Sequence, residues 1–143
     1  MLEEFVKKLN DKIIIVGSSA LACNGLVAGY VGYDIWTKYP FMNKVPLDNG
    51  IVLEHYHFHD DYQLEEISEK VFLPSVERSL IDTMVWYQEN SLEGFLIEAL
   101  QDYQYHEHKV SELYECADHY LVPHEVVDYW WNEALEESDM SMG

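Results

Sequence analysis

The pattern of apolar and polar residues changes from strand-like to helical near the middle of the chain. In the first half, apolar residues form short continuous or alternating runs, which are typical of β-strands. The continuous β-branched run at 13–16 predicts a strand in the middle of a sheet. Alternation predicts further strands at 31–37 and 51–59, and a short strand at 64–67 that pairs with another at 71–73.

Two short helices are expected among these strands. Apolar residues on one face predict a helix at 2–9. After the first strand, the small residues at 17–19 predict a tight turn that caps a helix at 20–24. Gly25 can end that helix, so the expected order is strand, turn, helix.

After Pro74 the apolar residues recur at spacings of three and four. This pattern predicts four helices, at about 75–88, 92–104, 108–120 and 123–136. Strands followed by helices indicate an α+β fold, in which a small mixed sheet in the N-terminal half packs with a helical C-terminal half. We expect a single domain over residues 1–137 and a frayed polar tail at 138–143.

The first of the four helices contains a group of charged residues between its apolar positions. Ser75 can cap the helix, and Glu77, Arg78 and Asp82 follow it. Because Arg78 and Asp82 are four residues apart, we expect them to face each other on the helix surface. We interpret the three charged residues as a structural polar cluster.

The charge of the chain is strongly negative and is concentrated in the helical half. The 143 residues contain 8 Lys and Arg against 27 Asp and Glu, a net charge of −19. Residues 71–143 contain sixteen acids against two bases, Arg78 and Lys109, and so carry −14 of this charge. Such a surface repels nucleic acid and attracts basic proteins, so we expect a basic protein partner and no direct nucleic-acid binding.

The remaining composition indicates an ordinary folded domain in a reducing compartment. Cys23 and Cys116 form neither a metal-binding spacing nor a disulfide framework. No apolar run approaches the roughly 18 residues of a membrane span, and no signal peptide is evident. We expect a cytoplasmic protein with no membrane partner, and the sequence leaves its oligomeric state open.

Three alternating histidines, His55, His57 and His59, are the sharpest candidate for metal chemistry. On a strand their imidazoles point to one face, where Asp60 or Asp61 can complete a metal shell. A metallohydrolase of the HxHxDH type places the aspartate before the last histidine, whereas Asp60 follows His59. We therefore expect histidines hydrogen-bonded to water, with no metal and no cofactor.

The segment from the first strand to Trp36 has the element order of a minimal nucleotidyltransferase. In that chemistry a Gly-Ser turn holds the triphosphate, and two carboxylates one residue apart hold magnesium ions. Here Asp34 is present, but Trp36 occupies the place of the second carboxylate. We therefore expect no transferase activity and no catalytic residues.

The carboxylates of the helical half are the preferred candidates for function. They lie opposite or beside the apolar stripes with almost no lysine between them, so they can imitate a phosphate backbone. One of the two adjacent tryptophans near the C-terminus is free to face a partner. The candidate partner-binding residues are Glu93, Glu98, Asp102, Glu112, Glu115, Asp118, Asp128 and Trp131.

Two short motifs resemble the C-terminal region of AbiEi-type antitoxins of type IV toxin–antitoxin, or abortive infection, systems. The family's "SALxxxGL" helix matches Ser19-Ala20-Leu21 and Gly25-Leu26. Its "PERxLxD" helix matches Pro74, Glu77, Arg78, Leu80 and Asp82, with two extra residues after the proline. The resemblance covers about residues 13–135.

The resemblance implies a non-catalytic domain that antagonises another protein. AbiEi-type antitoxins usually begin with a winged helix-turn-helix that binds their promoter, whereas these residues begin at the core domain, so DNA binding is not expected. The first hypothesis is an antitoxin or defence antagonist. The alternative is a phage-encoded acidic inhibitor, of the anti-CRISPR or DNA-mimic kind, that blocks a nucleic-acid-binding effector. A degenerate nucleotidyltransferase or metal-dependent enzyme ranks third.

Overall fold

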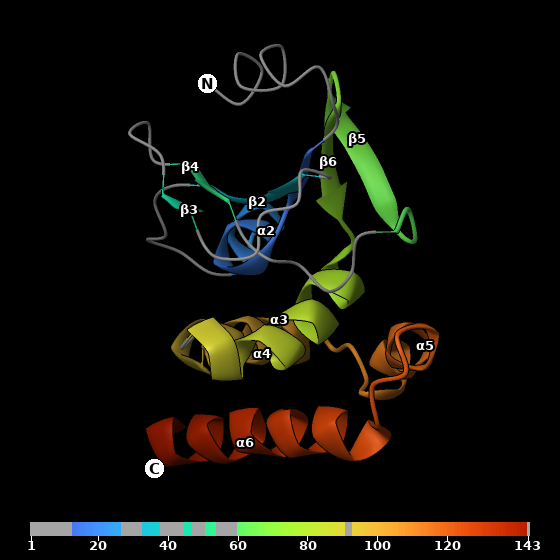
Figure 1. The fold of residues 1–143 in the computed structure, drawn as a ribbon. Helices are drawn as coiled ribbons and strands as arrows, with labels where there is room; N and C mark the ends of the chain where they lie inside the picture. The colour runs from blue at the N-terminus through green and yellow to red at the C-terminus, as the bar shows by residue number, and fades with distance from the viewer. Residues whose placement is uncertain are drawn as a thin grey trace.

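The protein has an α+β fold, in which a mixed sheet lies above layers of helices (Figure 1). This computed structural model describes residues 13–26, 33–37, 45–46, 51–53, 60–90 and 93–142. The strands are β1 (Ile13–Ile15), β2 (Tyr33–Thr37), β3 (Val45–Pro46), β4 (Ile51–Leu53), β5 (Leu64–Ser68) and β6 (Val71–Pro74). The helices are α2 (Gly17–Cys23), α3 (Val76–Asn90), α4 (Glu93–Tyr105), α5 (Ser111–His119) and α6 (His124–Met142).

The strand β1 lies in the interior of the sheet, as its continuous apolar run predicted. The strand order is β3-β4-β2-β1-β6-β5. β1 pairs antiparallel with β2 and parallel with β6, where Ile13 lies opposite Val71. All three isoleucines of β1 are buried, with neighbouring strands on both edges and α2 packed against the sheet. The predicted hairpin is also confirmed, since β5 and β6 pair antiparallel with Leu64 opposite Pro74.

The helix α2 begins three residues earlier than the sequence predicted. The expected turn at 17–19 is wrong, because these residues form the first turn of α2. Val16 is extended, and its carbonyl accepts a hydrogen bond from Ala20 N at 3.2 Å, so the helix starts directly after the strand. Gly25, with φ of +77°, follows the end of α2 as predicted.

The four predicted helices after Pro74 are confirmed, with shifted ends in α5 and α6. α5 begins at Ser111 rather than 108, because Glu107 has φ of +66° and residues 108–110 are not helical. The prediction of a frayed tail from 138 is also corrected, since α6 continues to Met142. No proline or glycine interrupts the chain between 124 and 142, so the helical pattern has no signal to stop.

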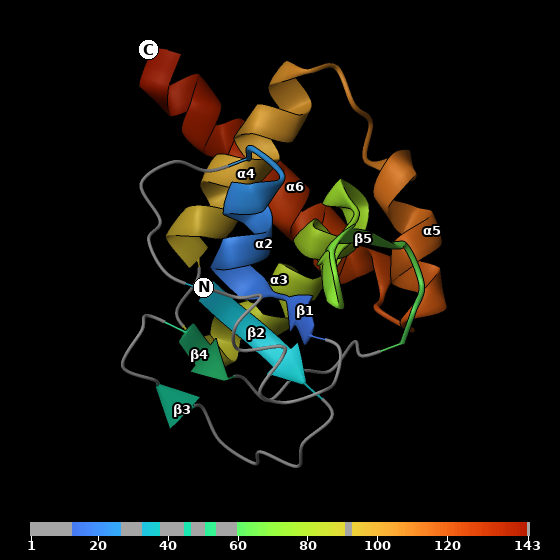
Figure 2. The same cartoon turned by 90° about the horizontal axis from the view of Figure 1, so that it is seen from above.

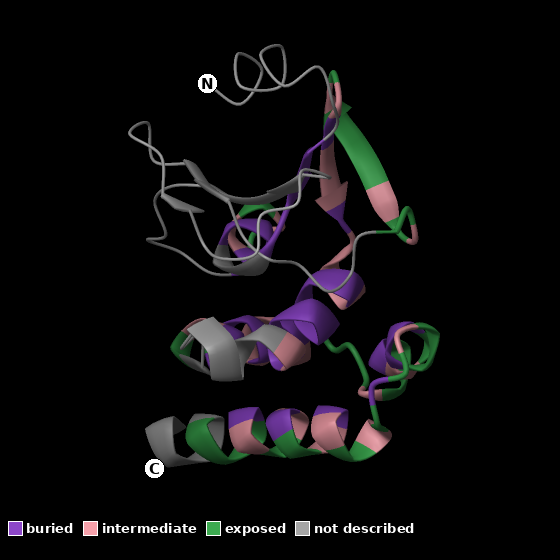
Figure 3. Cartoon of the chain, viewed as in Figure 1, coloured by how far each residue is buried: buried purple, intermediate pink, exposed green. Residues whose placement is uncertain are grey.

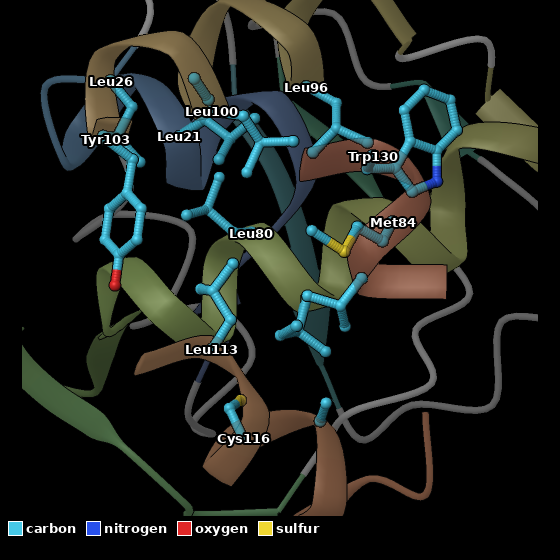
Figure 4. Close-up of a cluster of buried hydrophobic side chains, with 14 of the residues drawn as sticks. Leu21, Leu26, Leu80, Met84, Leu96, Leu100, Tyr103, Leu113, Cys116 and Trp130 are labelled. Carbon is cyan, nitrogen blue, oxygen red and sulfur yellow. The ribbon is translucent and has the colours of Figure 1, made fainter. Parts of the chain in front are cut away.

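The hydrophobic core joins the sheet to all of the described helices. α3 lies at its centre and contacts α2, α4, α5 and α6 (Figures 1 and 2). Leu80 and Met84 of α3 meet Leu100 of α4 and Trp130 of α6 in one cluster (Figure 4). The side of α6 that faces α3 and α4 is buried, and the opposite side is exposed (Figure 3).

The predicted helix at 2–9 lies outside the described residues. The three candidate metal-binding histidines, at 55, 57 and 59, also lie outside them. Of the predicted strands at 31–37 and 51–59, the structure describes Tyr33–Thr37 and Ile51–Leu53, and both are strands. The short strand β3 was not predicted, because Val45 and Pro46 stand in a segment rich in turn-forming residues.

Candidate functional site

Arg78 is completely buried and joins α3 to the segment before β5. Ser75 caps α3 as predicted, since its Oγ accepts a hydrogen bond from Arg78 N at 3.1 Å. The Arg78 side chain extends away from the helix, and its Nη1 donates to the backbone carbonyl of Asp60 at 3.0 Å and to that of Tyr62. The same nitrogen lies 3.5 Å from Asp60 Oδ1. The guanidinium therefore connects two segments that are 16 to 18 residues apart.

The carboxylate of Asp60 in turn connects this segment to the end of α5. Tyr120 Oη donates to Asp60 Oδ1 at 2.6 Å, and His119 Nε2 lies 2.9 Å from Oδ2. The Tyr62 ring stacks on the His119 imidazole, with ring centroids 3.7 Å apart. We call Asp60, Tyr62, Arg78, His119 and Tyr120 the Arg78 junction.

The electrostatics of the Arg78 junction favour an ionised Asp60. Partial burial raises the pKa of the Asp60 carboxyl, but hydrogen bonds to Tyr120 and His119 and the charge of Arg78 outweigh it. The pKa of Asp60 is therefore lowered. Burial, and then the hydrogen bond to Asp60, raises the pKa of the Tyr120 hydroxyl, so Tyr120 remains a donor.

The expectation that Arg78 and Asp82 lie on the helix surface is wrong, because both residues are buried. Their exposed fractions are 0%. A helix that is packed on several sides has little solvent-facing surface, so charged positions between the apolar ones are also enclosed. Buried charges need compensating contacts, and this supports the interpretation of Arg78 and Asp82 as structural.

Glu77, the third member of the predicted cluster, connects α3 to α4. Its carboxylate accepts a hydrogen bond from Tyr103 Oη at 2.9 Å. Tyr103 is buried, and burial followed by this hydrogen bond raises the pKa of its hydroxyl. The ring of Tyr103 also stacks on His108, with centroids 4.1 Å apart. Glu77 therefore provides the hydrogen-bond acceptor for the hydroxyl of a tyrosine in the core.

Several carboxylates of the helical half are held by contacts within the chain. Glu112 accepts from Lys109 N at 2.5 Å and lies 3.1 Å from His108 Nδ1. These two contacts, in that order, lower the pKa of the Glu112 carboxyl. Asp118 lies 2.7 Å from His124 Nε2, and Asp128 accepts from Tyr114 Oη. These three predicted partner-binding residues therefore also have local structural roles.

The exposed positions of α4, α5 and α6 carry many carboxylates. We call the surface that they form the acidic face. The adjoining sequence supplies almost no counter-charge, because Lys109 is the only lysine or arginine after Arg78. The exposed or half-exposed carboxylates of the acidic face are Glu98, Asp102, Glu112, Glu115, Asp118, Glu125, Asp128, Glu133, Glu136 and Glu137.

Among the predicted partner-binding residues, the carboxylates and the tryptophan differ in their placement. Glu98, Glu115 and Asp118 are exposed, whereas the Glu93 side chain lies outside the described residues. Trp131 is half-buried and packs against the core. Its ring meets Tyr103 edge to face, with centroids 6.1 Å apart.

The aromatic side chain that this part of α6 exposes is that of Tyr129. It is 55% exposed, whereas Trp130 is 3% exposed. Of Tyr129, Trp130 and Trp131, the sequence favoured Trp131 as the residue that faces a partner. Tyr129 lies one position outside the apolar stripe, and this offset was the available signal.

A cavity between α4 and α6 was not predicted. It has a volume of about 550 Å³ and lies beside Leu26, which follows α2. α4 contributes Glu98, Asp102 and Tyr105, and α6 contributes Leu135. Two glutamines of α4 complete the lining. Tyr105 and Leu135 are apolar residues outside their helices' stripes, a signal that could have indicated a surface feature.

The described residues do not test the two enzyme hypotheses, because the residues on which those hypotheses depend lie largely outside them. Among them, no group of three or more His, Cys, Asp or Glu side chains is arranged to hold a metal ion. β1, α2 and β2 follow one another as in a nucleotidyltransferase, but the side chains of Asp34 and Trp36 lie outside the described set. Cys116 is buried, and burial raises the pKa of its thiol to about 12, which is unsuited to a nucleophile.

Comparison with known proteins leaves the resemblance to AbiEi-type antitoxins as a prediction. No protein-family model and no curated protein matches the chain. None of the helices in the described part of the chain has the length and apolarity needed to cross a membrane.

Proposed function

We propose that this chain is a non-catalytic interaction protein that binds a basic protein through the acidic face. The observation that carries the proposal is the separation of charge. Arg78 is buried in the Arg78 junction, whereas the carboxylates of three helices remain at the surface. Lys109 is the only lysine or arginine that follows Arg78 in the sequence to offset them.

The placement of these carboxylates suits recognition of a positively charged surface. A concentration of like charge destabilises the folded chain through repulsion, so a purely solubilising surface normally mixes signs. An unmixed surface speeds the encounter with a basic partner and disfavours nucleic acid. The partner is a toxin or a nucleic-acid-binding defence effector, and the compartment is the cytoplasm.

The preferred role is that of an antitoxin or defence antagonist, following the AbiEi-like motifs. Regular carboxylates on rigid helices favour the second candidate, an acidic phage inhibitor of the anti-CRISPR or DNA-mimic kind. On α5, Glu112, Glu115 and Asp118 recur at spacings of three and are all exposed. Residues at this spacing lie on one side of a helix, so they present a row of charge. A degenerate nucleotidyltransferase or metal-dependent enzyme remains third.

A charge-reversal experiment tests the proposal. The test variant carries Glu98→Lys, Glu115→Lys and Glu125→Lys, one exposed residue from each helix of the acidic face. The matched control variant reverses three exposed glutamates of the β5–β6 hairpin, namely Glu65, Glu66 and Glu69. Both variants change the net charge equally, and thermal unfolding verifies that both remain folded.

The measurement is capture of partner proteins from lysate of the native host at low and high salt, read by mass spectrometry. We expect wild type and the hairpin variant to retain the same basic protein at low salt and to release it at high salt. The helical variant is expected to lose that protein. Unchanged capture and unchanged salt dependence in the helical variant would falsify the proposal. The identity of the captured protein separates a toxin from a nucleic-acid-binding effector.

A further inference from the structure

The cavity between α4 and α6 combines charge, an exposed aromatic ring and apolar surface at one place. Tyr105 is 82% exposed and Leu135 is 42% exposed, both high values for large apolar side chains. Glu98 and Asp102, one helical turn apart on α4, line the same cavity. The cavity therefore offers apolar surface and negative charge side by side, which suits a side chain with an apolar stem and a cationic head.

The base of the cavity is held by hydrogen bonds between the two helices. Gln104 Nε2 donates to the backbone carbonyl of Trp131 at 3.0 Å, and Gln101 Nε2 donates to that of Ala134 at 3.3 Å. α4 also packs along α6, with Leu96 and Leu100 in the core (Figure 4). The walls therefore stand on rigid elements, so little ordering is required when a ligand enters.

We infer that this cavity is the docking site for an arginine side chain of the basic partner. A guanidinium can hydrogen-bond to a carboxylate in a planar geometry and stack on an aromatic face, while its stem packs on apolar surface. The cavity supplies each of these contacts: carboxylates from Glu98 and Asp102, a ring from Tyr105, and apolar surface from Leu135. The inference rests on the proposed function and names the group that the acidic face recognises.

Lysine fits the same cavity less well. Its ammonium is a compact, strongly hydrated charge that does not match the plane of a carboxylate or stack on a tyrosine ring. His106 lies next to this site, with Nδ1 3.6 Å from Asp102 Oδ2, and shares one of the two carboxylates. Arginine can use Glu98 and the ring of Tyr105 even so. The cavity should therefore distinguish two cations of equal charge.

The test uses two capped peptides of equal charge, tetra-arginine and tetra-lysine, titrated into the ¹⁵N-labelled full chain. We expect tetra-arginine to bind several-fold more tightly, with backbone amide shifts centred on Gln101, Tyr105 and Leu135. Tyr105→Ala, which leaves the charge unchanged, should weaken tetra-arginine binding about two- to fivefold and reduce the preference over lysine. Glu98→Gln combined with Asp102→Asn should weaken it about tenfold.

The matched control is Glu65→Gln combined with Glu66→Gln on β5, which removes the same charge elsewhere and should leave the preference for arginine intact. The inference is overturned if the two peptides bind equally. It is also overturned if the amide shifts spread over α5 and α6 while the residues that line the cavity do not shift. Those outcomes leave the acidic face as a general electrostatic surface, and the proposed function stands. If instead the cavity selects arginine but charge reversal leaves partner capture unchanged, the proposed function fails and the docking site remains.

Discussion

The Arg78 junction and the acidic face use charged residues in opposite ways. In the Arg78 junction a buried guanidinium donates hydrogen bonds to two backbone carbonyls and lies near a carboxylate, so its charge is compensated within the chain. On the acidic face many carboxylates lie at the surface of three helices, and Lys109 is the only lysine or arginine in the sequence of these helices and their connections. We therefore expect stability to depend on the first region and, under the proposed function, recognition to depend on the second.

The largest expected effect separates the two regions directly. Arg78→Ala removes a buried cation and leaves the carbonyls of Asp60 and Tyr62 without their donor, so we expect a loss of about 3 kcal/mol or more in the free energy of unfolding. Urea denaturation measures this loss. Lys109→Ala is the control, because it removes an exposed cation instead of a buried one, and it should change stability by about 0.5 kcal/mol or less. An Arg78→Ala protein of full stability that no longer captures its partner would move the site to the Arg78 junction.

A smaller loss of stability is expected when the hydrogen bond between Tyr103 and Glu77 is removed. Tyr103→Phe removes the hydrogen bond to Glu77 while keeping the buried ring, so we expect a loss of about 1.5 kcal/mol in unfolding free energy. Tyr105→Phe changes the same group on a ring that is 82% exposed and should have almost no effect. Equal effects of the two substitutions in urea denaturation would contradict the role assigned to Glu77.

The pH dependence of stability tests the contribution of Asp60 to the Arg78 junction. The folded-state pKa of Asp60 is lowered, so its contribution is present above its unfolded pKa, about 3.9, and is lost as pH falls through the folded value. Asp60→Asn should lower stability at neutral pH by less than about 1 kcal/mol, because the side chain is 48% exposed. The difference from wild type should shrink below about pH 4. Urea midpoints at several pH values measure it, and a constant difference would contradict this account.

The smallest expected effect on stability belongs to the acidic face. Glu98→Gln, Glu115→Gln and Glu125→Gln together should change unfolding free energy by about 0.5 kcal/mol or less, and upwards if at all, because they remove like charge. Added salt should raise the thermal midpoint of wild type more than that of the triple variant, since it screens repulsion. A clear loss of stability in the triple variant would place these residues with the structural ones.

The sequence predicted the elements well because their signals are local. The hairpin of β5 and β6, the cap at Ser75 and the buried run of β1 each depend on neighbouring residues. The burial of Arg78 was not predicted, because the helical pattern shows which residues are apolar but not how many sides of a helix are covered.

The contacts of the candidate sites were harder to predict because they join distant segments. Asp60 meets Tyr120, 60 residues later, and no spacing rule connects them. The cavity arises from how α4 and α6 pack, so Tyr105 and Leu135 could be recognised only as apolar residues outside a stripe. The acidic character of the surface, in contrast, was predictable from composition alone.

The parallel pairing of β1 with β6 has a consequence for folding during synthesis on the ribosome. Ile13 lies opposite Val71, so β1 gains this neighbour only after the ribosome has made the intervening residues. Until then one edge of a wholly apolar β-branched strand has no native partner, a condition that favours misfolding and aggregation. Co-translational folding of the N-terminal half must therefore wait for β6 and the start of α3, which makes the nascent chain at this stage a natural client for chaperones.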